Sequence, residues 1–413
     1  MHRIEANVLI PGRGDPIDDG CVLLDGATIT YAGPRAGAPP TEGAEHHQVP
    51  VVMPGLWDCH VHLFGIASAN LADVLRLQPA VGGARAVKDL EAALNAGFTS
   101  VREMGGLGIY LAQVVDEGTV QGPAIYAAGA LLSQTGGHGD IHAAPVQWVE
   151  DYGARGGCLH LCDGVPECLR GVRRQLRLGA RLIKVCGTGG VLSEIGLPTH
   201  QQFSDAELQA MVGEAARAER IVAAHCHGKP GIEASVRAGV GTIEHGTHLD
   251  EPTAQLMNDH GAILVPTHTI TARVLDHGPR LGVPDYALEK MDVIIGLQQR
   301  ATQIAMAAGV TIALGTDVLS SGPDTVCPWG IHGGELGYLV QSGMTPLQAI
   351  EAGTANGPLT LGPQGPKSGQ LLQGYDADVI AVAENPVDDI TVLAEPAKVT
   401  KVWRAGRLVK GAP

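Results

Sequence analysis

The middle of the chain repeats one pattern of polar and apolar positions. A stretch with helical periodicity ends at a glycine, and a short run of mostly β-branched, apolar residues follows at once. The glycines in this place are Gly97, Gly179, Gly239, Gly261 and Gly309. A glycine after the last helical turn is typical of the left-handed residue that ends a helix. The pattern therefore predicts repeated units of one strand and one helix.

Five candidate strands follow these glycines, and three further runs of similar composition bring the number of candidate strands to eight. They are Val51–Leu56, Phe98–Val101, Ala124–Ala128, Ala180–Val185, Ile221–Ala224, Val240–Glu244, Ala262–Val265 and Val310–Leu314. A capping box from Ser204 to Glu207 predicts a helix that runs to about Arg220. Eight such units in about 300 residues predict an α/β fold of the TIM (β/α)8 barrel type, although periodicity alone also fits an open, doubly wound sheet.

Both ends of the chain carry short β-type runs separated by Gly and Pro instead of helices. The predicted strands are Ile4–Leu9, Gly20–Leu24, Thr28–Ala32, Asp378–Val382, Lys398–Trp403 and Arg407–Lys410. We predict that residues 1–52 and 365–413 pair into one small β-sandwich domain, and that residues 53–364 form the barrel.

Composition narrows the possible partners. The 413 residues include 28 Lys and Arg against 43 Asp and Glu, which gives a net charge of −15. This charge repels nucleic acid and anionic membrane surfaces, so neither is an expected partner. The eight cysteines are scattered without a CxxC pair, and no apolar run approaches the roughly 20 residues of a membrane span. We expect a cytoplasmic protein.

The first candidate for metal chemistry is the sequence Asp58-Cys59-His60-Val61-His62 after the first predicted central strand. His60 and His62 are two residues apart on an extended backbone and point to the same side. Histidines at strand ends are often only hydrogen-bonded. A barrel has its active site at the carboxyl ends of its strands, however, which favours a metal here.

Lys184 is the second candidate, because it interrupts an apolar predicted strand where a lone ammonium is costly to bury. It could extend to solvent or pair with a carboxylate. Alternatively, burial could lower its pKa enough for the amine to take up carbon dioxide as a carbamate. Such a carbamate could bridge two cations.

Further candidates follow the later strands. A second HxH pair consists of His225 and His227, His245 follows the next strand, and Asp317 follows the last one. Together His60, His62, Lys184, His225, His245 and Asp317 suit a site for two metals. Other polar groups are weaker candidates: His248, His260, His268 and His277, and the group Cys158, His160, Cys162 and Cys168, whose spacing matches no standard zinc finger.

These motifs resemble the amidohydrolase superfamily, in its imidazolonepropionase-like and prolidase-like branch. The resemblance covers nearly the whole chain in matching order. It rests on residues 53–62, 133–140, 183–185, 224–229, 244–245, 312–317 and 374–379. HxH alone is common, whereas this ordered set is highly specific.

The resemblance implies a metal site residue by residue. One divalent ion, expected to be zinc, would be held by His60, His62 and Asp317, and a second by His225 and His245, with carboxylated Lys184 between them. His138 and His227 would face the substrate. We expect segments 158–168 and 320–334, which match the family least, to set selectivity. We also expect a homo-oligomer.

The implied reaction is hydrolysis of an amide in a small molecule, with Asp317 moving a proton from the attacking water to the leaving amine. The expected substrates are N-acyl amino acids with a free carboxylate, including ochratoxin A, which would yield ochratoxin alpha and phenylalanine. Alternatives are an Xaa-Pro or Xaa-Arg dipeptidase or carboxypeptidase and a cyclic amide hydrolase. A non-catalytic assembly protein is disfavoured because every ligand position is intact.

Overall fold

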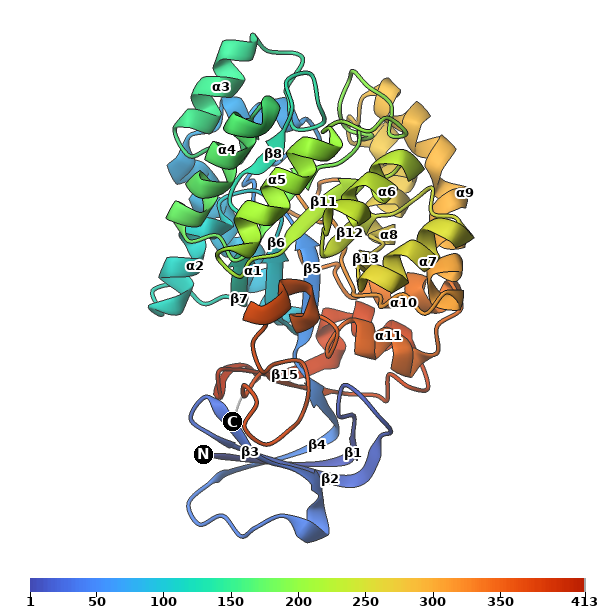
Figure 1. Ribbon diagram of the computed structural model, residues 1–413. Helices are drawn as coiled ribbons and strands as arrows, with labels where there is room; N and C mark the ends of the chain where they lie inside the picture. The colour runs from blue at the N-terminus through green and yellow to red at the C-terminus, as the bar shows by residue number, and fades with distance from the viewer. Residues whose placement is uncertain (412–413) are drawn as a thin grey trace.

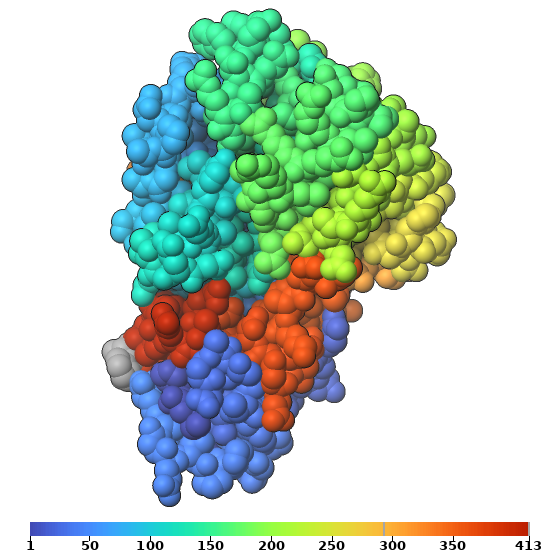
Figure 2. All heavy atoms as spheres, turned by 60° about the vertical axis from the view of Figure 1, so that its left-hand side comes forward, coloured from blue at the N-terminus to red at the C-terminus, as the bar shows by residue number. Residues whose placement is uncertain are grey.

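A computed structural model describes residues 1–411, with the backbone only for residues 292 and 293. The last two residues of the predicted terminal domain, 412 and 413, lie outside the described residues. Figure 1 shows two parts: a smaller one made of strands, which contains both chain ends, and a larger one in which helices surround strands. In Figure 2 the N-terminal residues in blue and the C-terminal residues in red lie side by side in the smaller part.

The smaller part is one seven-stranded sheet. Its strands are β1 (His2–Leu9), β2 (Ile17–Asp25), β3 (Thr28–Pro34), β4 (Glu45–Pro54), β14 (Val379–Val382), β15 (Val399–Arg404) and β16 (Arg407–Lys410), in the order β16-β15-β14-β4-β1-β2-β3. The two ends of the chain do pair, as predicted. The predicted sandwich is corrected to a single mixed sheet, because β4 bonds parallel to β1 and antiparallel to β14 and so joins both ends edge to edge.

The prediction of a first central strand at Val51–Leu56 is wrong. These residues divide between β4, which ends at Pro54, and the central strand β5 (Leu56–Val61). Gly55 separates the two strands, and its backbone N–H donates to the carbonyl of Asp378 at 2.9 Å. A Cβ at position 55 would lie only 2.1 Å from Oγ1 of Thr99, so only glycine fits at this change of sheet. His60 therefore lies inside β5 and not after it.

The larger part contains two parallel sheets. A three-stranded sheet has the order β5-β6-β7, with β6 (Phe98–Glu103) and β7 (Ala124–Ala127). A six-stranded sheet has the order β13-β12-β11-β10-β8-β9. Its strands are β8 (Leu131–Ser133), β9 (Leu159–Leu161), β10 (Ile183–Cys186), β11 (Val222–Cys226), β12 (Thr242–His245) and β13 (Ile263–Val265). The sequence did not predict β8 and β9, which are only three residues long each.

The segment predicted as the last strand, Val310–Leu314, is not a regular strand. It makes one isolated parallel bridge, from Ile312 to Leu264 of β13. Its carbonyl at Leu314 accepts from the N–H of Cys59 in β5 at 2.8 Å, and the N–H of Arg181 donates to Ala127 of β7 at 2.8 Å. These bonds connect the two sheets at both sides, which favours the predicted closed barrel, although the strand ladders form two separate sheets.

Helices cover the outside of these strands (Figure 1). They are α1 (Pro79–Asn95), α2 (Gly108–Asp116), α3 (Val146–Ala154), α4 (Gly164–Leu178), α5 (Asp205–Ala216), α6 (Lys229–Ala238), α7 (Glu251–His260), α8 (His268–His277), α9 (Asp285–Ala307), α10 (Gly334–Gln341) and α11 (Pro346–Ala352). The capping box of Ser204 and Glu207 is confirmed, and α5 ends at Ala216. The five glycines predicted to end helices all have φ between 68° and 95°, as expected.

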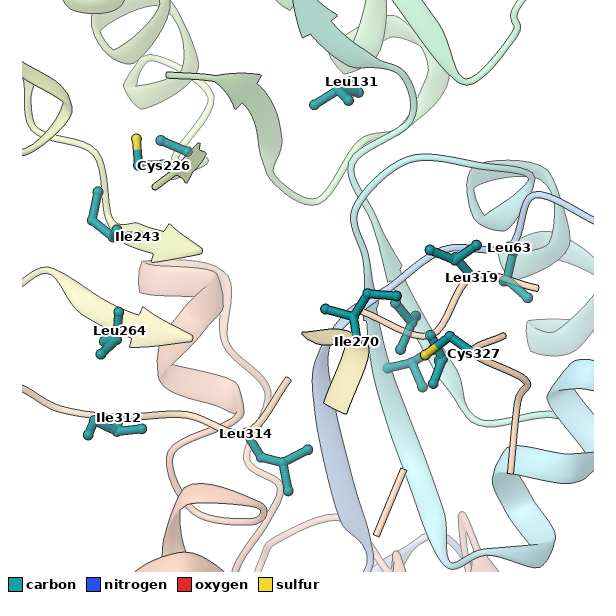
Figure 3. Close-up of a cluster of buried hydrophobic side chains, with 14 of the residues drawn as sticks. Leu63, Leu131, Cys226, Ile243, Leu264, Ile270, Ile312, Leu314, Leu319 and Cys327 are labelled. Carbon is teal, nitrogen blue, oxygen red and sulfur yellow. The ribbon is translucent and has the colours of Figure 1, made fainter. Parts of the chain in front are cut away.

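The core of the larger part combines side chains from the parallel strands, from the loops after them and from the inner faces of the surrounding helices. Figure 3 shows Ile243, Leu264 and Ile312 in a row along neighbouring segments, each buried. Leu63 and Leu319 lie at the other side of the same cluster. Across residues 1–411, none of the helices combines the length and apolarity needed to cross a membrane.

Candidate metal centre

The predicted site residues come together in one pocket. They are His60, His62, His138, Lys184, His225, His227, His245 and Asp317. Four of them stand within the last three residues of strands β5, β10, β11 and β12, whose carboxyl ends meet at this place. This is the position at which parallel α/β folds hold their active sites.

The first group of donors consists of His60, His62 and Asp317. Nε2 of His62 lies 3.3 Å from Oδ1 of Asp317, and Nε2 of His60 lies 3.6 Å from the same oxygen. The Nδ1 atoms of both rings are bonded elsewhere: to Oε2 of Glu244 for His60 and to the carbonyl of Gly105 for His62, each at 2.8 Å. Both Nε2 atoms therefore face one carboxylate, which is a suitable arrangement for a divalent cation.

The second group surrounds His245. The ligand atoms of His225, His227 and His245 lie within 4.8 Å of one another, and so do those of His60, His245 and Asp317. His245 is thus shared between the two groups. A hydrogen bond of 2.7 Å from its Nδ1 to Oγ1 of Thr267 holds its ring. The predicted pair of His225 and His245 is brought together, and His227 is an additional nitrogen beside them.

Lys184 lines the same pocket and is 2% exposed. Its Nζ has no hydrogen-bond partner among the described residues, so the alternative of a lysine paired with a carboxylate is not what the structure shows. Burial lowers the pKa of Lys184, although the charge of Glu244 opposes part of this effect. A buried, partnerless amine next to imidazoles and a carboxylate fits the modified lysine and the divalent ions that the motifs imply.

His138 and His227 lie beside these donors. The ring of His138 stacks on that of His225 with 4.1 Å between centroids, and Nδ1 of His227 bonds Oγ1 of Thr247 at 2.8 Å. Burial lowers the pKa of His138 to about 4 and that of His227 to about 3. Both imidazoles are therefore neutral at pH 7, and each retains one N–H that can donate a hydrogen bond.

A buried ionic network behind His60 escaped the sequence prediction. Glu244 and Arg102 are 0% exposed, and the guanidinium donates to Oε1 of Glu244 at 2.7 Å. Arg102 also donates to the carbonyl of Cys59 at 2.6 Å. Burial by itself would raise the pKa of Glu244, but the charges of Arg102 and Lys184 and the bond to His60 lower it instead. Ionised Glu244 therefore fixes the orientation of the His60 ring.

We expect Arg102→Met to lower the free energy of unfolding by about 3–5 kcal/mol, because it leaves the Glu244 carboxylate buried without a countercharge. Urea unfolding measures this loss. The matched control is Arg173→Met, which breaks an exposed pair with Glu214 and should cost much less, because solvent screens that pair. Equal, small losses in the two variants would contradict a structural role for the buried pair.

Asp58 is a further residue whose role the sequence did not reveal, although it precedes the first HxH pair. Its Oδ1 accepts from the N–H of His60 at 3.0 Å and from that of Thr316 at 3.1 Å. Its Oδ2 lies 2.8 Å from Nδ1 of His332. Asp58 thus connects β5 to the turn that carries Asp317. The backbone of Asp317 in this turn has a positive φ of 60°.

The segments expected to set selectivity differ in position. Cys158 and Leu159, from segment 158–168, line the pocket. No described lining residue comes from segment 320–334, and His332 of that segment is buried against Asp58. The rest of the lining is apolar except for Thr271, so Asp317 is the one acidic side chain among the described lining residues.

The weaker candidates do not join this site. None of the histidines at 248, 260, 268 and 277 is among the described lining residues, and Nε2 of His268 bonds Oγ1 of Thr302 at 3.0 Å. All eight cysteines are free and buried. In the part of the chain that the structure describes, no group of metal-type ligands includes Cys158, Cys162 or Cys168.

Comparison with known proteins agrees with this geometry. Residues 51–409 match the amidohydrolase family. Ochratoxinase from Aspergillus niger is 42% identical over 99% of this chain and 86% of its own length. The crystal structure of the A. niger ochratoxinase matches with a TM-score of 0.93, and the match covers 100% of this chain and 96% of the ochratoxinase chain. A crystal structure of a prolidase complexed with N-methylphosphonate-L-proline matches at 32% identity and a TM-score of 0.92, covering 100% of both chains. The resemblance drawn from the motifs is confirmed.

Proposed function

Because this chain belongs to the amidohydrolase family and is a hydrolase that acts on amides, we propose that it is a two-metal enzyme that cleaves the amide bond of N-acyl amino acids. One observation carries the proposal. Eight residues from distant parts of the sequence converge on one pocket, and the buried Nζ of Lys184 among them has no hydrogen-bond partner within the described part of the chain.

We propose that His60, His62 and Asp317 would hold one divalent ion, that His225 and His245 would hold the other, and that carboxylated Lys184 would bind both. Zinc suits imidazole and carboxylate ligands. When bound, the ions would supply Lewis acidity toward the amide carbonyl and would make water nucleophilic near neutral pH. Glu244 and Asp58 would keep the rings and the carboxylate in place.

The proton transfers fall to Asp317. Its carboxylate would accept a proton from the attacking water and then donate that proton to the nitrogen of the leaving amine, since an amide anion is a very poor leaving group. The N–H groups of His138 or His227 would hydrogen-bond the oxygen of the former carbonyl as negative charge develops on it. Such a donor is typically worth about 2.7–4 kcal/mol in the transition state.

We further propose that the central strands and segment 310–318 form a closed (β/α)8 barrel within residues 53–364, which residues 1–52 and 365–413 flank as one domain. The links between β7 and Arg181 and between β5 and Leu314 support this arrangement. A closed barrel would place all eight site residues on one rim.

The proposed substrate is ochratoxin A or a similar N-acyl amino acid with an apolar acyl group. The similarity to ochratoxinase supports this class, and so does the apolar lining around the donors, which includes Phe64, Val74 and Ile270. The alternative of an Xaa-Pro dipeptidase rests on the similarity to a prolidase structure. An acyl-arginine substrate is less suitable, because Asp317 is the one acidic side chain among the described lining residues and is assigned to the metal site.

Parallel assays test this choice. We expect kcat/KM for ochratoxin A to exceed that for Xaa-Pro dipeptides and for acyl-arginine measured under the same conditions. A higher kcat/KM for an Xaa-Pro dipeptide would make prolidase activity the function instead. If metal-loaded protein hydrolyses none of the three amides, both the proposed activity on N-acyl amino acids and the prolidase alternative are overturned.

We expect the pocket to hold close to two divalent ions per chain in purified active protein, most of them zinc, so elemental analysis should find at least two. Removal of the metal with a chelator should abolish amide hydrolysis, and added zinc should restore it. The matched control is the Lys184→Met variant, which should hold less metal after the same purification. Full activity in metal-free protein would refute the proposed site.

A further inference from the structure

A second cluster of metal-type side chains lies in the seven-stranded sheet, outside the pocket. It consists of His2 on β1 and Glu45 and His47 on the neighbouring strand β4. In the parallel register His2 is opposite Glu45, and Ile4 is opposite His47. The three side chains therefore project from the same face of two bonded strands. We propose that this cluster binds one divalent cation of the zinc type.

The spacing of the donor atoms supports the proposal. Nδ1 of His2 lies 3.1 Å from Nε2 of His47, and the Glu45 oxygens lie 3.5 Å from the first nitrogen and 3.4 Å from the second. Tetrahedral zinc binds nitrogen and oxygen at about 2.0–2.1 Å, which places neighbouring ligand atoms about 3.3–3.4 Å apart. The two nitrogens lie slightly closer together than that, and each of them has one Glu45 oxygen at about that distance: Oε2 beside His2 and Oε1 beside His47. The carboxylate is therefore near enough to share one ion with both imidazoles.

A pair of histidines that share a proton is the competing explanation. It accounts for the 3.1 Å contact between the two rings, but it does not account for Glu45. A carboxylate that accepts a hydrogen bond from imidazole comes within about 2.7–3.2 Å. The Glu45 oxygens stay farther away from both nitrogens, at a distance expected between ligands of one ion.

Burial also suits a cation site that is open on one side. The His47 side chain is 1% exposed, and its ring packs edge-on against Trp403 with 5.1 Å between centroids. The side chains of His2 and Glu45 are 16% and 42% exposed. A cation can therefore enter from solvent, bind a rigid nitrogen on β4 and complete its coordination with water. The Glu45 carboxylate would offset part of its charge.

Such an ion would connect the first residue of β1 to β4, the strand that joins both ends of the chain. We therefore expect zinc binding at the cluster to stabilise the terminal sheet without changing amide hydrolysis. Ligands that bind only the folded state raise the melting temperature in a concentration-dependent way.

The test compares untagged holoenzyme with three variants after equilibrium dialysis against zinc, followed by elemental analysis. Wild type should hold one more ion per chain than Glu45→Gln or His47→Gln. The matched control is His46→Gln, because His46 is exposed between the two ligands and points to the other side of β4, so this variant should bind as wild type does. Glu45 is on the surface, and its change leaves the core intact.

A second readout is the dissociation constant for the additional zinc ion, which we expect Glu45→Gln to raise at least tenfold. Replacing a residue that only hydrogen-bonds a metal ligand typically lowers metal affinity 10–100-fold, so replacing a ligand should have at least this effect. Zinc should raise the melting temperature of wild type and His46→Gln but not that of Glu45→Gln. Equal ion content in wild type and Glu45→Gln would overturn the proposal and would show that His2 and His47 form only a hydrogen-bonded pair. An equal loss in His46→Gln would show non-specific surface binding. Because the test counts a difference between variants, its outcome is independent of the ions in the pocket.

Discussion

Lys184→Ala is expected to reduce kcat for amide hydrolysis by at least about 10³-fold. The substitution removes the proposed bridging ligand between two metal ions, whose activation of water and carbonyl supplies several kcal/mol, and each 1.4 kcal/mol corresponds to about tenfold in rate. Steady-state kinetics together with elemental analysis measures the effect. We expect the bound metal to fall along with the rate.

Added short carboxylic acids should restore part of the activity of Lys184→Ala, because a small carboxylate can occupy the space that the side chain leaves. Lys184→Met is the matched control, since its side chain fills that space and should prevent rescue. In metal-free protein its free energy of unfolding should equal or exceed that of wild type, because an unpaired buried amine is replaced by an apolar group. Near-normal turnover in Lys184→Met would show that Lys184 is only a packed residue.

The candidate site was predictable from the sequence because its residues stand in local patterns. His60 and His62 are two apart on a strand, Lys184 is a lone charge in an apolar run, and Asp317 follows a Gly-Thr turn. Each pattern marks a residue by its neighbours along the chain. Their convergence in one pocket then follows from the parallel direction of the strands, which places all carboxyl ends on one side.

The supporting network was not predictable in the same way. Arg102 and Glu244 belong to strands β6 and β12 of different sheets, and no local pattern shows that a guanidinium from one reaches a carboxylate on the other. His332 likewise contacts Asp58 across 274 positions of sequence. A buried charge pair is specified by the tertiary fold, and the sequence displays only two isolated charges at strand positions.

The errors in the fold have a similar cause. The apolar run before the first HxH pair reads as one strand, but the sheet changes at Gly55, where the close approach of Thr99 decides the break. Strands β8 and β9 are too short to show a period. Segment 310–314 has the composition of a strand, yet it pairs with β13 at Ile312 only and bonds elsewhere through single contacts.

Asp317→Asn is expected to retain metal but to lower kcat for an amide substrate by about 10²–10⁴-fold, the usual contribution of general acid–base catalysis. The amide oxygen of asparagine can still act as a ligand beside His60 and His62, whereas it cannot accept and return a proton. The loss should be much smaller for an ester analogue with an activated leaving group, because that group departs without protonation. The measurement is kcat for both substrates at equal metal content.

Wild type and Asp317→Asn should therefore differ in the ratio of the two rates, which a merely structural change would not alter. Asn at 317 can keep the bond from its backbone N–H to the carbonyl of His60, 2.7 Å long in the native protein, because that bond does not involve the side chain. The positive φ of 60° is also tolerated by asparagine. If the variant keeps its metals and loses little activity on amide and ester alike, then the proton moves through another group, and His227 and His138 are the residues in the pocket to replace next.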